Sequence, residues 1–248
     1  MKISFPHSLA VALGVSVLAL TVSPTQATTY PGNGNSSFGG PLGLGSLTFT
    51  DDGTTVFGTF TRGPGFHNDT VVIYIDSIAG GLNTTSGMDD AGDDLRRALS
   101  GWNGTQRSTV NFAAGFNADF GIAIHNNSFT FGGLWQTQAG TGNNGLPFVD
   151  SVNLSGGGNG AATYTFDFNW SEIGLGSPGS FRFVASYVAN SAYRSNEAIG
   201  ASDAGAGDVA FGTLTFSGSE IYTVPEPSGV ALAGLGWLVV VALRRIGR

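Results

Sequence analysis

Along most of the chain, apolar and polar residues alternate with a period of two, the spacing of a β-strand. In residues 162–169, Tyr164, Phe166 and Phe168 share one side, while Thr163, Thr165 and Asp167 share the other. This pattern predicts a strand with one packed face and one face in water. The stretch 180–188 receives the same interpretation.

The alternating runs recur at short intervals and are separated by turn residues. They cover residues 46–50, 55–61, 70–76, 108–112, 118–125, 128–132, 162–169, 180–188 and 209–216. Only 93–102 and 170–175 have a helical pattern, and both stretches are brief. Strands at this spacing without long helices between them predict an all-β fold: an antiparallel β-sandwich, jelly-roll-like, with one or two short helices.

The first 27 residues have the layout of a secretory signal. Lys2 precedes an apolar run over 9–22, and Thr25-Gln26-Ala27 supplies a small-residue exit. We therefore expect a signal peptide over 1–27 that is cleaved after Ala27, and export of the remainder. The body over 28–223 then has the size of one large all-β domain.

The chain ends in an apolar run over 229–243 followed by Arg244 and Arg245. At about 1.5 Å per residue, a helix of that length is shorter than a hydrocarbon core of roughly 30 Å. It would serve as a short transmembrane helix only in a thin membrane or with help from its flanks. The positive-inside rule assigns the arginine end to the cytoplasm and the body to the opposite side.

Between the body and the apolar run lies Val224, Pro225, Glu226, Pro227. The prolines disfavour helix and favour an extended strip that a protease could grip. The order of Pro-Glu-Pro, short apolar helix and basic cluster over 224–248 resembles the PEP-CTERM sorting signal. This resemblance implies an exosortase-type processing enzyme as a partner, a precursor held transiently in the inner membrane, and a final place in the cell envelope, at the surface or outside the cell.

The tail is also compatible with two other kinds of C-terminal segment. One is a plain C-terminal membrane anchor with incidental prolines, which the short span and the terminal arginines also fit. The other is a GPI signal, but such tails do not normally end in a cationic cluster. The sorting signal is favoured because three ordered features coincide with an N-terminal signal.

Composition and charge narrow the function classes. Charged residues make up 11% of the chain, against an ordinary share of about 25%, and 40 residues are glycine. The body has no lysine and six arginines against thirteen aspartates and three glutamates. Nucleic-acid binding needs clustered cations and is excluded. The chain has no cysteine, so a disulfide framework, a thiolate metal site and a cysteine nucleophile are excluded as well.

Three segments of the body, 68–76, 118–124 and 164–175, resemble the carbohydrate-binding family-9-like or DOMON-like sandwiches. Those domains carry a strand ending in Tyr-x-Asp, a later Ala-Asp-aromatic strand, and a strand that runs into a short Trp-containing turn. The resemblance implies a β-sandwich that binds sugar.

Tryptophan faces are candidate platforms for sugar rings, with Asn and Gln nearby for the hydroxyls. Trp102 and Trp135 are the candidates. Trp135 lies in a Gly-rich context and is expected to have the more exposed face, whereas Trp170 follows inward-facing phenylalanines and is expected in the core.

The densest acidic stretch contains Asp89, Asp90, Asp93 and Asp94. Oxygen ligands of this kind suit Ca²⁺, although the EF-hand pattern is missing. The alternative is a helix start, because the helix dipole favours negative charge at its N-terminal end and positive charge at the other end. We favour the helix start, with Ca²⁺ as the only cofactor candidate.

Histidines and carboxylates of the body are candidates for acid–base pairs. His67 and His125 could pair with an aspartate at 69, 76 or 119, but no motif ties a nucleophile or ligand to them. Glycoside hydrolysis needs two carboxylates about 5 to 9.5 Å apart, for which Glu172, Asp119 and Asp167 are the candidates. Sequence spacing does not bring any of them together, so no catalytic residue is predicted.

These observations favour a non-enzymatic role for the body. We expect a structural or adhesive domain in exopolysaccharide or biofilm material, with polysaccharide as a partner. A carbohydrate-binding module is the alternative, and a glycan-active enzyme is a more distant one.

Overall fold

The computed structural model describes residues 27–127, 130–176 and 178–224. The predicted signal peptide before Ala27 and the sorting signal after Val224 lie outside the described residues. Within the described part of the chain, no helix has both the length and the apolar character needed to cross a membrane. The apolar run 229–243 lies outside that part, so the transmembrane helix stays a prediction.

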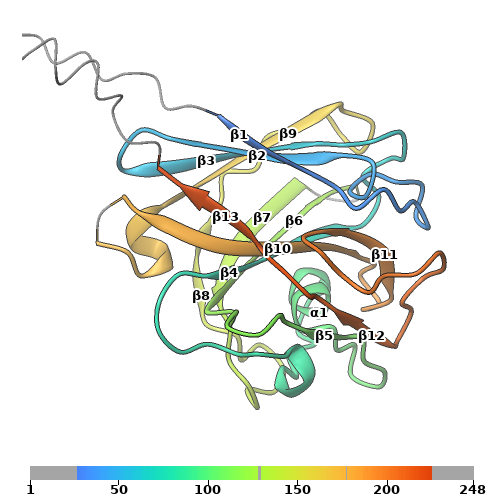
Figure 1. Cartoon of the computed structure of the whole chain (residues 1–248). Helices are drawn as coiled ribbons and strands as arrows, with labels where there is room; N and C mark the ends of the chain where they lie inside the picture. Colours follow the sequence, from blue (N-terminus) through green and yellow to red (C-terminus); the bar gives the residue numbers. More distant parts are fainter. Residues whose placement is uncertain (1–26, 128–129, 177, 225–248) are drawn as a thin grey trace, which may run out of the picture.

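Two antiparallel sheets pack face to face (Figure 1). The smaller sheet has the order β1-β2-β3-β9, with β1 Thr28–Pro31, β2 Ser46–Asp51, β3 Thr55–Thr61 and β9 Thr163–Asn169. The larger sheet has the order β11-β10-β4-β6-β7-β8, with β11 Arg194–Ile199, β10 Ser180–Val188, β4 Thr70–Asp76, β6 Phe120–Asn126, β7 Thr130–Gln136 and β8 Phe148–Ser151. A seventh strand, β13 Glu220–Thr223, pairs with the first half of β10. The predicted sandwich is confirmed.

One pair of strands departs from the antiparallel prediction. β5 Thr109–Asn111 and β12 Thr213–Thr215 form a separate two-stranded sheet, and its pairing is parallel. The two strands are far apart in sequence, so no hairpin forces them to run in opposite directions.

The helical stretches are short, as predicted. α1 Asp94–Ser100 begins after Asp93, whose carboxylate accepts from the backbone N–H of Arg96, and it ends at Gly101 with a positive φ of 67°. The helix-start interpretation of the acidic stretch is thereby confirmed. The second predicted helix is one 3₁₀ turn, η2 Trp170–Ile173, and another 3₁₀ turn, η1 Thr85–Gly87, was not predicted.

The space between the two sheets is filled largely by aromatic rings. Phe49 of the small sheet contacts Phe183 of the large sheet edge-on, with ring centroids 5.1 Å apart. Trp170 is 2% exposed and stacks on Tyr222, which confirms its predicted place in the core. Edge-on aromatic pairs of this kind add to the free energy gained by burial.

A second core lies on the opposite face of the large sheet. There, α1 places Leu95 and Leu99 against Val72 and Tyr74 of β4. Gly121 of β6 allows this approach, because a Cβ at that position would lie 2.3 Å from Leu99. The large sheet is therefore buried on both faces. The prediction that 180–188 has one solvent-exposed face is wrong for its second half. Both faces of that half are buried, because the second core covers the face that was expected to meet solvent.

Glu197 of β11, in the large sheet, binds the loop between β1 and β2 of the small sheet. The sequence of this loop has no alternating apolar and polar pattern. Its buried carboxylate accepts four backbone N–H groups between β1 and β2, at Phe38, Gly40, Leu42 and Gly43. These charge-assisted bonds satisfy donors that a loop of this kind would otherwise leave unpaired. The Glu197 carboxylate thus joins the Asn196 backbone and side chain in holding the Gly-rich segment against β11.

Candidate functional site

A concave site lies on the face of the large sheet that carries α1. Its wall is formed by the start of α1, by β7 and by the segment leading into β8, and it encloses about 460 Å³. Sites for small ligands commonly enclose about 300 to 1,000 Å³. We call it the aromatic hollow; its lining residues are Asp93, Arg96, Phe131, Trp135, Asn144, Gly145, Leu146, Pro147 and Phe148.

Three aromatic residues give the hollow its apolar surface. Phe148 is 54% exposed and Phe131 is 38% exposed, whereas Trp135 is only 4% exposed. The indole lies over Gly133, where a Cβ would stand 2.5 Å from it, and it meets the Phe148 ring at a centroid distance of 5.6 Å. The expectation that Trp135 presents an exposed face is wrong, because the second core covers it. Phe148 and Phe131 offer the open faces instead.

Polar groups stand on the opposite wall of the hollow. The guanidinium of Arg96 donates from Nε to the carboxylate of Asp93 at 2.7 Å and lies 3.7 Å from a carboxylate oxygen of Asp90. Both contacts hold its plane in place. The Arg96 side chain is 18% exposed and that of Asp93 is 48% exposed. A ligand hydroxyl, which both donates and accepts, would find a partner of each kind here.

Asp89 and Asp90 do not line the hollow, but they hold the loop that forms one of its walls. Asp90 is buried and accepts the backbone N–H groups of Gly92, Asn144 and Leu146. Asp89 accepts from the N–H of Gly142. These bonds fix the loop that supplies one side of the hollow.

Asp94, the last aspartate of the stretch, pairs with Arg97 on the surface of α1. Among the residues that the structure describes, no group of three or more His, Asp or Glu side chains could hold a metal ion. The four aspartates act as acceptors for protein donors, and Ca²⁺ binding finds no support in their arrangement.

Trp102 lies outside the aromatic hollow. It is half-buried, and the guanidinium of Arg107 covers one face of its ring at 4.9 Å from the centroid. A cation–π contact of this type occupies the face that a sugar ring would need. The structure therefore does not bring the two tryptophan candidates together.

The candidate histidines lie together at one end of the core. His67 is fully buried, its ring contacts Tyr164 edge-on at 4.6 Å, and neither ring nitrogen has a partner at hydrogen-bond geometry. Burial, with a contribution from His125, lowers the pKa of His67 to about 3. Burial also lowers the pKa of His125. Both rings are therefore neutral at ordinary pH, and both belong to the core.

The candidate carboxylates have structural roles. Asp119 precedes β6 and accepts the backbone N–H groups of Ser77 and Ile78, at the end of β6 remote from His125. Glu172 accepts the N–H of Asn169 in a capping box.

Two of the remaining candidates do lie near others: Asp119 adds to the raised pKa of Asp76, and the backbone of Asp69 hydrogen-bonds to His125. Asp76 lies at the end of β4 remote from His125 and faces Arg182 at 3.6 Å, and burial raises its pKa. Burial also raises the pKa of Asp69, which immediately precedes β4. Asp167 lies on the outer face of β9.

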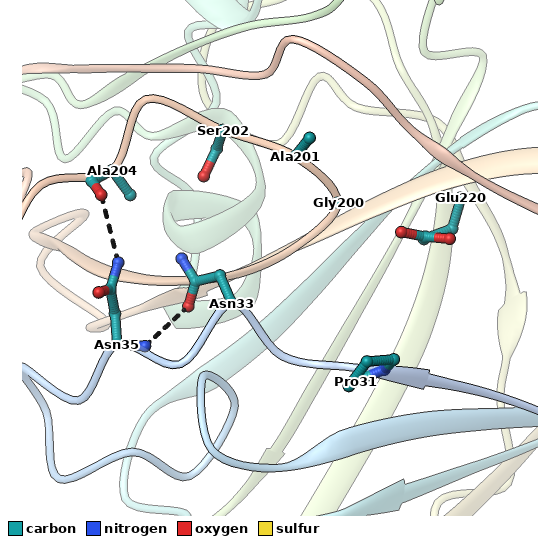
Figure 2. A pocket seen from close by; sticks show the side chains of 8 residues that line it. All are labelled: Pro31, Asn33, Asn35, Gly200, Ala201, Ser202, Ala204 and Glu220. Atoms are coloured by element: carbon teal, nitrogen blue, oxygen red, sulfur yellow. Dashed lines mark hydrogen bonds between the residues drawn. The ribbon is translucent and has the colours of Figure 1, made fainter.

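Two further hollows are less suited to a ligand. Figure 2 shows one of about 410 Å³, lined by Asn33, Asn35, Ser202 and Glu220 among others. The amide nitrogens of Asn33 and Asn35 already donate to backbone carbonyls, so they hold the walls together. A third hollow, of about 380 Å³, is lined by Asn83, Asn111, Asn117 and neighbouring residues. None of these three hollows is lined by two carboxylates.

Comparisons with known proteins give no relative. No protein-family model, no curated protein and no solved structure matches this chain. The resemblances to the PEP-CTERM signal and to sugar-binding sandwiches therefore stay predictions. The function has to be inferred from the geometry and chemistry of the chain itself.

Sequence reasoning missed most of the aromatic hollow. Phe148, Phe131, Arg96 and Asn144 were not predicted as site residues, although Trp135 was. The available signal was the exposed Pro147-Phe148 pair that follows a Gly/Asn-rich loop, a place where an aromatic residue has little reason to be buried. β8 was not recognised as a strand, so that signal had no structural context.

Proposed function

We propose that this protein is an exported adhesive domain that binds polysaccharide through the aromatic hollow. The observation that carries the proposal is the combination of open phenylalanine faces with a fixed guanidinium and carboxylate in one concave site. Sugar rings have apolar faces that stack on aromatic rings, and their hydroxyls need donors and acceptors. An acidic body without lysine favours a neutral glycan, because an anionic one would be repelled.

Binding is favoured over catalysis by the chemistry of the hollow. Asp93 is the only carboxylate among its lining residues, and that carboxylate is already paired with Arg96. Hydrolysis of a glycosidic bond needs a second carboxyl group across the cleft. A carbohydrate-binding module that attaches the protein to exopolysaccharide or biofilm material fits this arrangement.

The proposal includes the trafficking inferred from the two termini. The precursor carries a signal peptide over 1–27 and a sorting signal over 224–248 with a short transmembrane helix, and an exosortase-type enzyme removes the tail at the inner membrane. The processed protein then lies in the cell envelope, at the surface or outside the cell. A jelly-roll-like connectivity and kinship with the DOMON-like sandwiches belong to this proposal too.

Binding is tested by titrating the purified body with a panel of neutral polysaccharides in a calorimeter. We expect Phe148→Ala to weaken binding about tenfold, the loss that removing one stacking contact of usual strength produces. The matched control is Phe66→Ala, because Phe66 is 57% exposed and does not line the hollow. Equal affinities for the wild type and both variants would overturn the role of the hollow.

Trafficking is tested by measuring the mass of the protein recovered outside the producing cells. We expect a species that lacks residues 1–27 and is cut near Pro225-Glu226-Pro227. An exported species with an intact C-terminus through Arg248 would contradict processing. Replacing Pro225 and Pro227 by alanine should block the cut while leaving signal cleavage unchanged.

A further inference from the structure

The outer face of the small sheet carries hydroxyl side chains in register. Pairing places Thr29, Thr48, Thr59 and Thr165 in one straight row across β1, β2, β3 and β9. All four are exposed or half-exposed. Neighbouring strands lie about 4.8 Å apart, so the row repeats at that interval.

Two further rows flank this one at a spacing of two residues. One contains Ser46, Thr61 and Thr163, and the other contains Thr50, Phe57 and Asp167. Rows two residues apart are separated by about 6.8 Å along the strands. These three rows are called the threonine face.

The threonine face has almost no charge. Its one ionisable side chain is Asp167, which accepts from the Asn153 side chain at 2.8 Å. The solvent face of an antiparallel sheet commonly carries lysine and other charged residues, which also protect it from aggregation. A face of hydroxyls and methyl groups is complementary to an uncharged partner rich in hydroxyls, because neither surface then buries an unpaired charge.

Phe57 interrupts the pattern at the middle of the sheet. It is 42% exposed and lies on β3, opposite Thr50 on one side and Asp167 on the other. An open aromatic ring beside a carboxylate is also found in the aromatic hollow, where Phe148 and Asp93 line the same site. A water lattice such as ice would gain nothing from that ring, whereas the apolar face of a sugar stacks on it.

A second copy of the chain does not fit the threonine face. Four strands about 4.8 Å apart, one of four residues and three of six or seven, cover roughly 400 Å². A stable protein interface needs roughly 800 Å² from each partner. A long polymer avoids this limit, because many weak contacts repeated along one chain combine through high effective concentration.

We infer that the threonine face binds a neutral polysaccharide, with Phe57 stacking on a sugar ring and the threonine rows bonding to its hydroxyls. This inference rests on the proposed function, since it assigns a second surface to the same class of ligand. Figure 1 shows the small sheet and α1 on opposite sides of the large sheet. The hollow is lined by the start of α1, so it lies on the side of the sandwich opposite the threonine face. A molecule with a binding surface on each side cross-links two strands of polymer.

The test uses the body and microcrystalline cellulose as an ordered neutral glucan, measured as depletion of protein from solution. Phe57→Ala should weaken binding about tenfold. Thr59→Lys, which places a long charged side chain in the middle row, should weaken it further. The matched control is Thr105→Lys, because Thr105 is exposed in a loop outside the threonine face. Thermal unfolding of each variant verifies that the fold is intact.

Cross-linking gives a second readout. The wild type should aggregate suspended cellulose particles, whereas Phe57→Ala and Phe148→Ala should each bind particles without aggregating them. If Phe148→Ala loses binding while Phe57→Ala and Thr59→Lys match the wild type, this inference is overturned and the hollow stands alone. If the wild type binds neither cellulose nor any neutral polysaccharide of the panel, the proposed function fails with it. Incorporation of the wild type into growing ice, lost in Thr59→Lys, would replace the polysaccharide as occupant and overturn the inference.

Discussion

Strands of both sheets were predicted from the same alternating pattern, but the two sheets differ in how many of their faces are buried. In β9 of the small sheet, every second residue is buried and the others meet solvent. In β4 of the large sheet, six consecutive residues from Thr70 are buried. The difference comes from α1 and its loops, which cover the second face of the large sheet only.

This comparison separates two uses of a sheet. The large sheet gains stability from two apolar faces and supplies the rigid floor on which the aromatic hollow is built. The small sheet is stabilised through one face, so its other face is available for contacts with a ligand. Substitutions on the covered face should therefore change the free energy of unfolding, and those on the open face should change binding.

The largest effect is expected where one side chain joins the two sheets. Glu197→Leu removes the acceptor of four backbone N–H groups in the β1–β2 loop and leaves those of Gly40, Leu42 and Gly43 buried without a partner. We expect a loss of about 4 kcal/mol or more, because each orphaned donor costs about 1 to 3 kcal/mol. Urea unfolding followed by tryptophan fluorescence measures it. Asp150→Asn, a change at an exposed acid, is the control, and similar midpoints for the two variants would contradict the role of Glu197.

The next prediction compares one apolar side chain on each type of face. Leu99→Ala removes a buried contact between α1 and the large sheet and should cost about 3 kcal/mol. Phe57→Ala on the open face should cost less than about 1 kcal/mol. Chemical unfolding of both variants measures the two values. Comparable losses would mean that the outer face of the small sheet is covered as well.

The core between the sheets should respond to acid through His67. Its pKa is lowered from 6.5 to about 3 in the folded state, so the unfolded chain binds a proton that the folded chain rejects between these values. Stability is then greatest above pH 6.5 and falls as the pH drops toward 3, at about 1.4 kcal/mol per pH unit. The raised pKa values of Asp69 and Asp76 act in the opposite direction, because their folded forms retain protons more readily.

The contribution of His67 is isolated by difference. Unfolding free energies of the wild type and of His67→Phe are compared between pH 6.5 and 4.5, where we expect the wild type to lose about 2 kcal/mol more than the variant. Phenylalanine suits the site because the ring already contacts Phe60 and Tyr164. Equal pH dependence in the two proteins would contradict a buried neutral histidine.

The smallest effect tests one hydroxyl group on each face. Val72→Thr introduces a hydroxyl into the second core, between α1 and the large sheet, where Val72 is fully buried. The free energy of unfolding should fall by about 1 to 2 kcal/mol. Thr59→Val removes a hydroxyl from the threonine face and should change stability by no more than about 0.5 kcal/mol. Thermal unfolding of the pair measures both. A destabilised Thr59→Val would show that its hydroxyl supports the fold and is not free for a ligand.

Much of the secondary structure could be predicted because alternation is a local property of the chain. β3 and β4 coincide with the predicted runs 55–61 and 70–76, and the helix start at Asp93 followed from charge next to the helix dipole. β1, β8, β11 and β13 were missed. β8 and β13 are only four residues long, and β11 is rich in polar residues that distant loops satisfy.

What the sequence determined was the alternation, the acidic lysine-free body and the chemistry of its side chains, since these depend only on neighbouring residues. Tertiary structure decided which sheet face is covered, because α1 packs on residues far from it in the chain. It also decided that Trp135 is buried while Phe131 and Phe148 are open, and that Glu197 orders a distant loop. A pattern of period two shows only which side chains share one face of a strand. Whether that face is buried depends on the segments that pack against it, and these are distant in the sequence.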